Sequence, residues 1–260
     1  GSRKKPNGII DIAMMQTLKS FHDFGELPTY GQIIIDECHH IPCVTFEDIL
    51  KRIPALYILG LTATPYRKDQ LEKIISSYCG PIRHEITVSE QLEIPKIAKV
   101  KRTNLKLPEE LGAQPLIHLV WEQLIQNEER NNLIILDLLS CINQGRNSLV
   151  ISDRKEHLKS LEEKAIALQS DKTFKIFKLE SQEGKKKRAL ILEKIKEAIL
   201  LKESICLFAT ASLIGEGFDM PELDTLFLTM PLSFKGRMIQ YAGRLYRNSA
   251  NKKEIIIHDY

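Results

Sequence analysis

Short apolar runs alternate with segments of helical spacing along most of the chain. In the first part, apolar runs lie at residues 9–13, 32–35 and 55–61, and helical spacing is found at residues 46–52 and 69–78. Parallel strands that are covered by helices on both faces have this continuous apolar character, because neither side of the strand meets water. The pattern therefore predicts a parallel sheet with helices between its strands.

A second series of the same kind occupies the C-terminal part. Amphipathic spacing at residues 116–143 predicts two helices with a break near Asn127. Beyond it, the pattern predicts strands at residues 148–152, 175–179, 205–210, 223–229 and 255–258, with helices at residues 154–168 and 188–201. Strands that alternate with helices in this way indicate βαβ units and a parallel sheet.

A segment of different character separates the two series. Residues 89–115 contain three prolines and a basic run, and they predict only one strand, at residues 98–103. We therefore expect an α/β protein of two lobes. The first lobe is expected at residues 1–88, a connector at residues 89–115 and the second lobe at residues 116–260.

The composition is typical of a globular protein, with 43% hydrophobic and 27% charged residues. No apolar run approaches the ~20 residues that a membrane helix needs, and no apolar signal segment lies near the N-terminus. We expect a cytoplasmic protein without a membrane partner. Its five scattered cysteines are then expected to be reduced thiols.

The net charge of +3 says little about partners, but three basic runs are informative. They lie at residues 3–5, 96–106 and 184–188. A solvated surface is the commoner role of such runs, and contact with nucleic-acid phosphates is the alternative. Both roles stay open on this pattern.

One stretch carries candidate chemistry, because the apolar run at Ile33–Ile35 ends in two adjacent carboxylates, Asp36 and Glu37. Open parallel sheets bind ligands at the carboxyl ends of their strands. Asp36 could hold Mg²⁺ through water, and Glu37 could orient or deprotonate an attacking water. The alternative is a pair of surface acids at a strand end.

The residues that follow raise the possibility of a zinc site. Cys38, His39, His40 and Cys43 supply ligand atoms that zinc accepts. Adjacent Cys-His-His side chains cannot easily converge on one tetrahedral centre, however, and no second Cys/His cluster accompanies them. The sequence therefore disfavours zinc.

Four segments resemble, in the same order, motifs of the superfamily 2 helicases and translocases. Asp36-Glu37-Cys38-His39 matches the signature Asp-Glu-x-His, and Thr62-Ala63-Thr64-Pro65 resembles the next motif. Gly215-Glu216-Gly217-Phe218-Asp219 resembles the fifth motif, and Gln240–Arg247 fits the sixth, Gln-x-x-Gly-Arg-x-x-Arg. The resemblance is strongest to the branch that includes type III restriction subunits and excision-repair helicases.

This resemblance implies two RecA-like lobes with parallel sheets, ATP and Mg²⁺ in the cleft, and nucleic acid across their tops, DNA favoured over RNA. Asp36 and Glu37 would serve Mg²⁺ and water. Arg244 and Arg247 would reach the phosphates, with Arg247 as the arginine finger. His39 would pair with Gln240 across the cleft. The remaining motif residues would couple the two ligands or contact one of them: Thr62, Thr64, Gly215, Gly217, Asp219 and Gly243.

The phosphate-binding loop of the family, Gly-x-x-x-x-Gly-Lys-Ser/Thr, is absent from the sequence. In the family it precedes the Asp-Glu motif, and only 35 residues stand before Asp36. The resemblance therefore implies that the first lobe is truncated at its N-terminus and that the chain alone is inactive. The apolar run at residues 55–61 would become an open sheet edge. Either the missing N-terminal half is bound as a separate chain, or the edge pairs with a second copy.

Two other functions stay open. One is a helicase-like module that binds nucleic acid or a protein without hydrolysing ATP. The presence of Asp36, Glu37, Arg244 and Arg247 argues against it, since such a module would not need all four. The other is a motor coupled to a nuclease, although no nuclease constellation is visible in these 260 residues.

Overall fold

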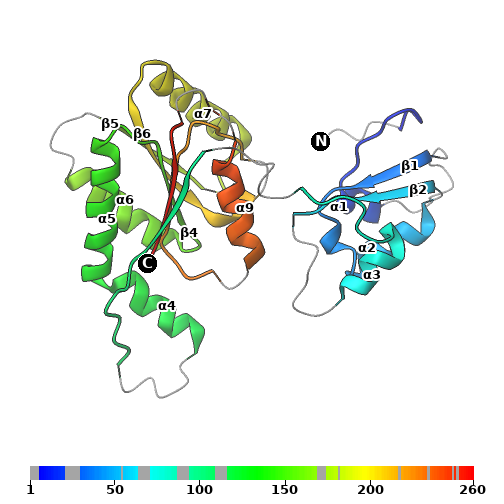
Figure 1. The fold of residues 1–260 in the computed structure, drawn as a ribbon, viewed down its shortest axis with the longest axis horizontal. Coiled ribbons are helices and arrows are strands. Elements are labelled where there is room, and N and C mark those ends of the chain that lie inside the picture. The colour runs from blue at the N-terminus through cyan, green and yellow to red at the C-terminus, as the bar shows by residue number, and fades with distance from the viewer. Residues whose placement is uncertain are drawn as a thin grey trace. The chain divides into compact units, whose positions relative to one another are not determined.

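The computed structural model describes residues 6–20, 30–53, 55–63, 71–86, 94–108, 116–168, 174–180, 182–215, 218–232, 235–247, 249 and 252–260. The chain divides into two compact units, unit 1 (Gly1–Thr87) and unit 2 (Val88–Tyr260). Figure 1 labels their helices and strands. No helix in the described ranges is long and apolar enough to cross a membrane.

The described part of unit 1 contains a two-stranded parallel sheet. Strand β1 (Tyr30–Ile35) pairs with β2 (Ala55–Gly60), and Ile34 lies opposite Leu59. Both strands were predicted from their continuous apolar runs. Four helical elements accompany them: α1 (Met15–Lys19), the 3₁₀ helix η2 (Cys38–His40), α2 (Val44–Arg52) and α3 (Glu72–Cys79).

The two faces of this sheet differ in burial. One face packs Ile33, Ile35 and Ile58 against apolar side chains of α2 and α3. On the other face, Ile34, Tyr57 and Leu59 are 61%, 69% and 42% exposed. A parallel sheet is ordinarily covered on both faces. In the described part of unit 1 there is therefore a bare apolar sheet face, defined here by Ile34, Tyr57 and Leu59.

The predicted strand at residues 9–13 was wrong. Asp11 accepts hydrogen bonds from the amides of Asn7 and Gly8, and the Asn7 side chain accepts one from the amide of Ile9. Asn and Asp side chains that bond nearby amides in this way favour a turn over a strand. Ile9 and Ile12 are 83% and 98% exposed, so the apolar side chains of this segment are not buried against the described residues.

Unit 2 is built on a six-stranded sheet in which every pairing is parallel. Its strands, in spatial order, are β3 (Lys96–Val100), β8 (Ile255–Asp259), β7 (Thr225–Leu228), β4 (Ser148–Ser152), β6 (Ser204–Thr210) and β5 (Phe174–Leu179). Strand β3, predicted at residues 98–103, begins two residues earlier and lies at an edge of this sheet.

Helices cover both faces of this sheet, as its continuous apolar strands predicted. The helices are α4 (Ile117–Gln126), α5 (Glu128–Asn143), α6 (Lys155–Ala167), α7 (Lys185–Leu200), α8 (Ala211–Gly215) and α9 (Lys235–Leu245). The predicted break near Asn127 is confirmed. The Asn127 side chain accepts the Arg130 amide at 2.8 Å and so caps the start of α5.

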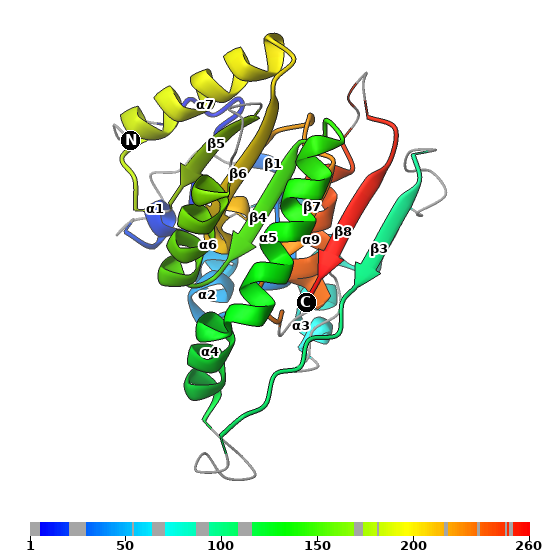
Figure 2. The ribbon, with the colours of Figure 1, turned by 90° about the vertical axis from the view of Figure 1, so that its left-hand side faces the viewer.

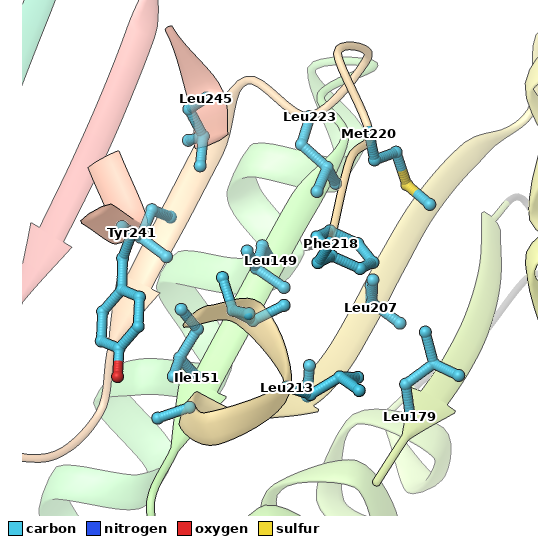
Figure 3. Close-up of a cluster of buried hydrophobic side chains, with 14 of the residues drawn as sticks. Leu149, Ile151, Leu179, Leu207, Leu213, Phe218, Met220, Leu223, Tyr241 and Leu245 are labelled. Carbon is cyan, nitrogen blue, oxygen red and sulfur yellow. The ribbon is translucent and has the colours of Figure 1, made fainter. Parts of the chain in front are cut away.

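Successive side chains of β4 point to opposite faces and enter two separate cores. Val150 packs with residues of α5 and α6, which lie in front of the sheet in Figure 2. Leu149 and Ile151 pack on the other face with residues of α7, α8 and α9. Figure 3 shows Tyr241 and Leu245 of α9 in this second core. The packing fixes α9, which carries part of the sixth motif, against the sheet.

Candidate functional site

The acid motif lies in a tight turn at the carboxyl end of β1. Asp36 is exposed, and its Oδ1 accepts the Glu37 amide at 3.0 Å. Glu37 has a φ of 52°, in the left-handed region, which costs a residue with a Cβ about 1–2 kcal/mol. The Leu61 amide donates to the Ile35 carbonyl at 2.8 Å, and the Cys38 amide donates to the Leu61 carbonyl at 2.9 Å. These two hydrogen bonds hold the strained turn against the end of β2.

His39 joins the acid motif to the segment after β2. Its Nδ1 lies 2.9 Å from the Thr62 hydroxyl and 3.2 Å from Glu37 Oε2. Glu37 Oε2 is a buried oxygen, and apart from this ion-pair contact it accepts no hydrogen bond from the described residues. Glu37, His39 and Thr62, which belong to two successive motifs, therefore lie side by side.

The carboxylates of this turn fit a magnesium ion. Mg²⁺ in nucleotide sites is held by one or two carboxylates together with phosphate oxygens and waters. Asp36 offers an exposed carboxylate, and Glu37 offers the acceptor that lacks a donor. Across the described ranges, no group of three or more His, Cys, Asp and Glu side chains could hold a metal ion. The turn thus suits an ion that takes most of its ligands from nucleotide and water.

In unit 2, residues of the fifth and sixth motifs are in contact. Arg244 lies in the last turn of α9, and its Nε donates to the Ile214 carbonyl of α8 at 3.2 Å. Arg247 lies just beyond α9 and forms an ion pair with Asp219. The side chains of this pair are 44% and 51% exposed. Both arginines are therefore anchored to the segment that follows β6, and solvent reaches the Arg247–Asp219 pair.

Several predicted site residues stay untested by the geometry. Thr64 and Gly217 lie outside the described residues, as does the side chain of Gln240. Gly215 ends α8, and a Cβ added at Gly243 would have no atom within 4 Å. The pairing of His39 with Gln240 therefore remains a prediction.

Sequence reasoning missed a buried polar network at the carboxyl end of β4. The Ser152 hydroxyl accepts the Arg154 amide at 3.1 Å and lies 3.3 Å from His157 Nδ1. His157 Nε2 lies 2.9 Å from Asn131 Oδ1. Burial, and secondly the charge of Arg130, lower the pKa of His157 to about 4. A neutral histidine therefore links α5 and α6 to the end of β4.

At the carboxyl end of β4, the side chain of Arg154 stacks on an aromatic ring. The Arg154 guanidinium lies 4.1 Å from the centre of the Trp121 ring of α4, within the range of a cation–π interaction. A sequence signal for this position existed. Ser152-Asp153-Arg154 follows an apolar strand in the same way that Asp36-Glu37 does, at the edge where parallel sheets bind ligands.

One solved structure resembles this chain in fold, and curated proteins resemble it in sequence. The S. cerevisiae Dbp5 structure bound to RNA and ADP BeF3 matches 100% of this chain and 61% of its own, with a TM-score of 0.60 and 13% identity. This likeness concerns the fold alone. The protein L396 of Acanthamoeba polyphaga mimivirus, whose name describes an ATP-dependent RNA helicase, is 25% identical over 95% of this chain and 46% of its own length. "Probable helicase D10" of Escherichia phage T5 is 26% identical over 96% of this chain and 53% of its own. The chain thus spans about half the length of these relatives.

Two sequence families match separate parts of the chain. The family described as "Type III restriction enzyme, res subunit" matches residues 2–67, which contain the acid motif. The family described as "Helicase conserved C-terminal domain" matches residues 130–249, which contain the fifth and sixth motifs. Together they cover well over half of the 260 residues, with the motifs in the order found in such proteins. The chain therefore belongs to the superfamily 2 helicases.

Proposed function

We propose that the protein is an ATP-dependent helicase or translocase that acts on nucleic acid, with DNA favoured over RNA. The observation that carries this proposal is the contact of Glu37, His39 and Thr62 at the carboxyl end of β1. In such a turn the carboxylates can bind the nucleotide's metal ion, and a movement of the turn on binding would reach the segment after β2 through the contact of His39 with Thr62. A surface acid pair would need neither the strained Glu37 backbone nor the histidine.

In this proposal each residue of the turn has one task. Asp36 would hold Mg²⁺, and Glu37 would orient the water that attacks the terminal phosphate of ATP. When bound with ATP, the ion would supply positive charge that neutralises the phosphate oxygens. His39 holds Glu37 and Thr62 together and pairs with Gln240 of unit 2. Thr62, with Thr64, carries the change to the nucleic-acid side.

Unit 2 supplies the arginines and the remaining contacts. Arg247 is the arginine finger, with Arg244 as a second phosphate contact. Because Arg247 pairs with Asp219 here, it must exchange this carboxylate for phosphate when nucleotide binds. Both partners are about half exposed, so the exchange costs little. Asp219 is then released to contact nucleotide or nucleic acid, together with the glycines of its motif and the sixth: Gly215, Gly217 and Gly243.

The preference for DNA is supported by the match to the restriction-subunit family over residues 2–67. RNA is the alternative that an assay with both polymers would reveal. Strand β3 lies at one edge of the second sheet and carries Lys96, whose ammonium lies 4.3 Å from the centre of the Tyr246 ring, and the exposed Lys99. Lys99 suits contact with a phosphate backbone of either kind.

Hydrolysis is proposed to need residues beyond these 260. The sequence contains no Gly-Lys-Ser/Thr phosphate loop, and unit 1 has the bare apolar face of Ile34, Tyr57 and Leu59. Both observations are explained if an N-terminal half of the core, in the same polypeptide or as a separate chain, covers that face and supplies the loop. This chain alone is then inactive.

The test measures ATP hydrolysis by the purified chain and by a longer form that carries the N-terminal half, each with single-stranded DNA, duplex DNA, RNA or no polymer. We expect no turnover by the chain alone and DNA-stimulated turnover by the longer form, which Glu37→Gln abolishes. Turnover by the chain alone would refute its inactivity. A longer form that binds labelled DNA without turnover would replace the helicase proposal with a non-hydrolysing binding module.

A further inference from the structure

Two cysteines from distant parts of unit 1 converge over β2. Cys38 begins η2 directly after Glu37, and Cys79 ends α3. A Cβ added at Gly60 would lie 2.9 Å from Cys38 Sγ and 2.7 Å from Cys79 Sγ. Both sulfurs therefore reach the same point above Gly60. The absence of a side chain at Gly60 is what gives them room.

The surroundings of the two thiols differ in solvent access. Cys38 is 3% exposed in the core of unit 1, and Cys79 packs against that core but is partly exposed. Burial, and secondly the neighbouring Cys79, raise the pKa of Cys38 to about 11. Burial also raises the pKa of Cys79. Both thiols are therefore protonated near neutral pH, so they react slowly.

We propose that Cys38 and Cys79 are a modification site, at which a disulfide-type oxidant forms a bond between them that locks the acid-motif turn to α3. With oxidised glutathione, the Cys79 thiolate attacks one sulfur and releases one glutathione thiolate. The Cys38 thiolate then attacks the Cys79 sulfur of the mixed disulfide and releases the second. The two protons of the cysteines pass to the two glutathione molecules, and a reducing thiol reverses both steps.

The disulfide would restrict the movement of the turn that carries Asp36 and Glu37, without contacting their carboxylates. Cys38 lies between Glu37 and His39, and its amide already donates to the Leu61 carbonyl. A covalent tie from Cys38 to α3 would remove the freedom of this turn to change with nucleotide. The bond itself is inferred from the positions of the sulfurs, and only its effect on the response to nucleotide rests on the proposed function.

The experiment treats the folded chain with oxidised glutathione at about pH 8 and maps peptides without reduction. The native chain is compared with two variants, Cys43→Ser and Cys79→Ser. Cys43 is the matched control because it is exposed and lies only a few residues from Cys38. We expect a peptide linked through Cys38 and Cys79, unaffected by Cys43→Ser, with both thiols lost at one rate.

Three outcomes would overturn the inference. Cys79 could accumulate as a stable glutathione adduct, Cys38 could pair with Cys43, or Cys38 could be oxidised equally fast in Cys79→Ser. Peptide mapping of the native chain decides the first two without any variant. As a second readout, amide hydrogen exchange at residues 36–41 should slow in the oxidised chain and recover with dithiothreitol.

Discussion

Acidification should destabilise unit 2 through two buried histidines. Burial and the charge of Arg130 lower the pKa of His157 from 6.5 to about 4. The pKa of His258 is also lowered to about 4, mainly by burial, with Lys99, Lys101 and Arg146 acting in the same direction and Asp137 opposing them. Both side chains are almost fully buried, at 0% and 2% exposed. Neither can take up a proton without losing stability.

The direction of the pH effect on stability depends on whether the folded or the unfolded chain binds the proton. Below pH 6.5 the unfolded chain protonates both histidines while the folded chain keeps them neutral, so stability falls with falling pH. Above pH 6.5 neither histidine lowers the free energy of unfolding. Below pH 6.5 the free energy of unfolding falls progressively, and the loss reaches its limit near pH 4. At about pH 5 each histidine should cost about 2 kcal/mol, since one pKa unit corresponds to about 1.4 kcal/mol. Together they should lower the free energy of unfolding by about 4 kcal/mol.

The assay is urea unfolding followed by fluorescence of Trp121, the only tryptophan, which lies in unit 2. Unfolding free energies are compared at about pH 7.5 and pH 5 for the native chain, His157→Gln, His258→Gln and the exposed control His118→Gln. Each buried variant should lose about half of the pH dependence, and the control none. An unchanged pH dependence in His157→Gln would refute the reasoning, whatever the stability of that variant at pH 7.5.

Three further predictions concern packing, buried charge and catalysis. Gly60→Ala should destabilise unit 1 by about 1–3 kcal/mol, because its Cβ would meet two sulfurs closer than 3 Å. Gly31→Ala is the control, because a Cβ added at Gly31 would have no neighbouring atom of the described residues within 4 Å. Hydrogen exchange of the α3 amides measures the difference in stability. Arg146→Met should lower the free energy of unfolding of unit 2 by about 3–5 kcal/mol, since it leaves the carboxylates of Asp224 and Glu254 without their cation. Lys159→Met removes a cation from an exposed pair and should lower it by less than about 1 kcal/mol. Equal losses in urea unfolding would contradict this reasoning. In the longer form, Glu37→Gln should lower the ATPase rate by at least about 10²-fold and leave DNA binding unchanged, and a parallel loss of binding would argue for a structural role.

The strands could be predicted where burial alone sets their sequence. Strand β4 falls on the predicted residues, because each of its five side chains is buried and three of them form a continuous apolar run. The segment at residues 9–13 has the same apolar character, but its Asn and Asp side chains bond the backbone locally. Strand β3 shifted by two residues because its register is set by β8, far along the chain.

The candidate site was predictable where motif residues are close in sequence. Glu37 and His39 lie in one turn, and Thr62 follows the strand that pairs with β1. The Arg247–Asp219 pair and the convergence of Cys38 with Cys79 depend on how separate elements pack. No local pattern records such contacts, since each partner alone resembles an ordinary surface or core residue.

The position of β3 also bears on how unit 2 forms during synthesis. Among the described strands of unit 2, β3 is the first to be translated, and its one partner there is β8, which ends at Asp259. At typical translation rates its backbone waits on the order of ten seconds for this partner. The lysines at positions 96 and 99 keep such a waiting strand from joining other chains. The last strand of unit 2 to be synthesised thus places the first one.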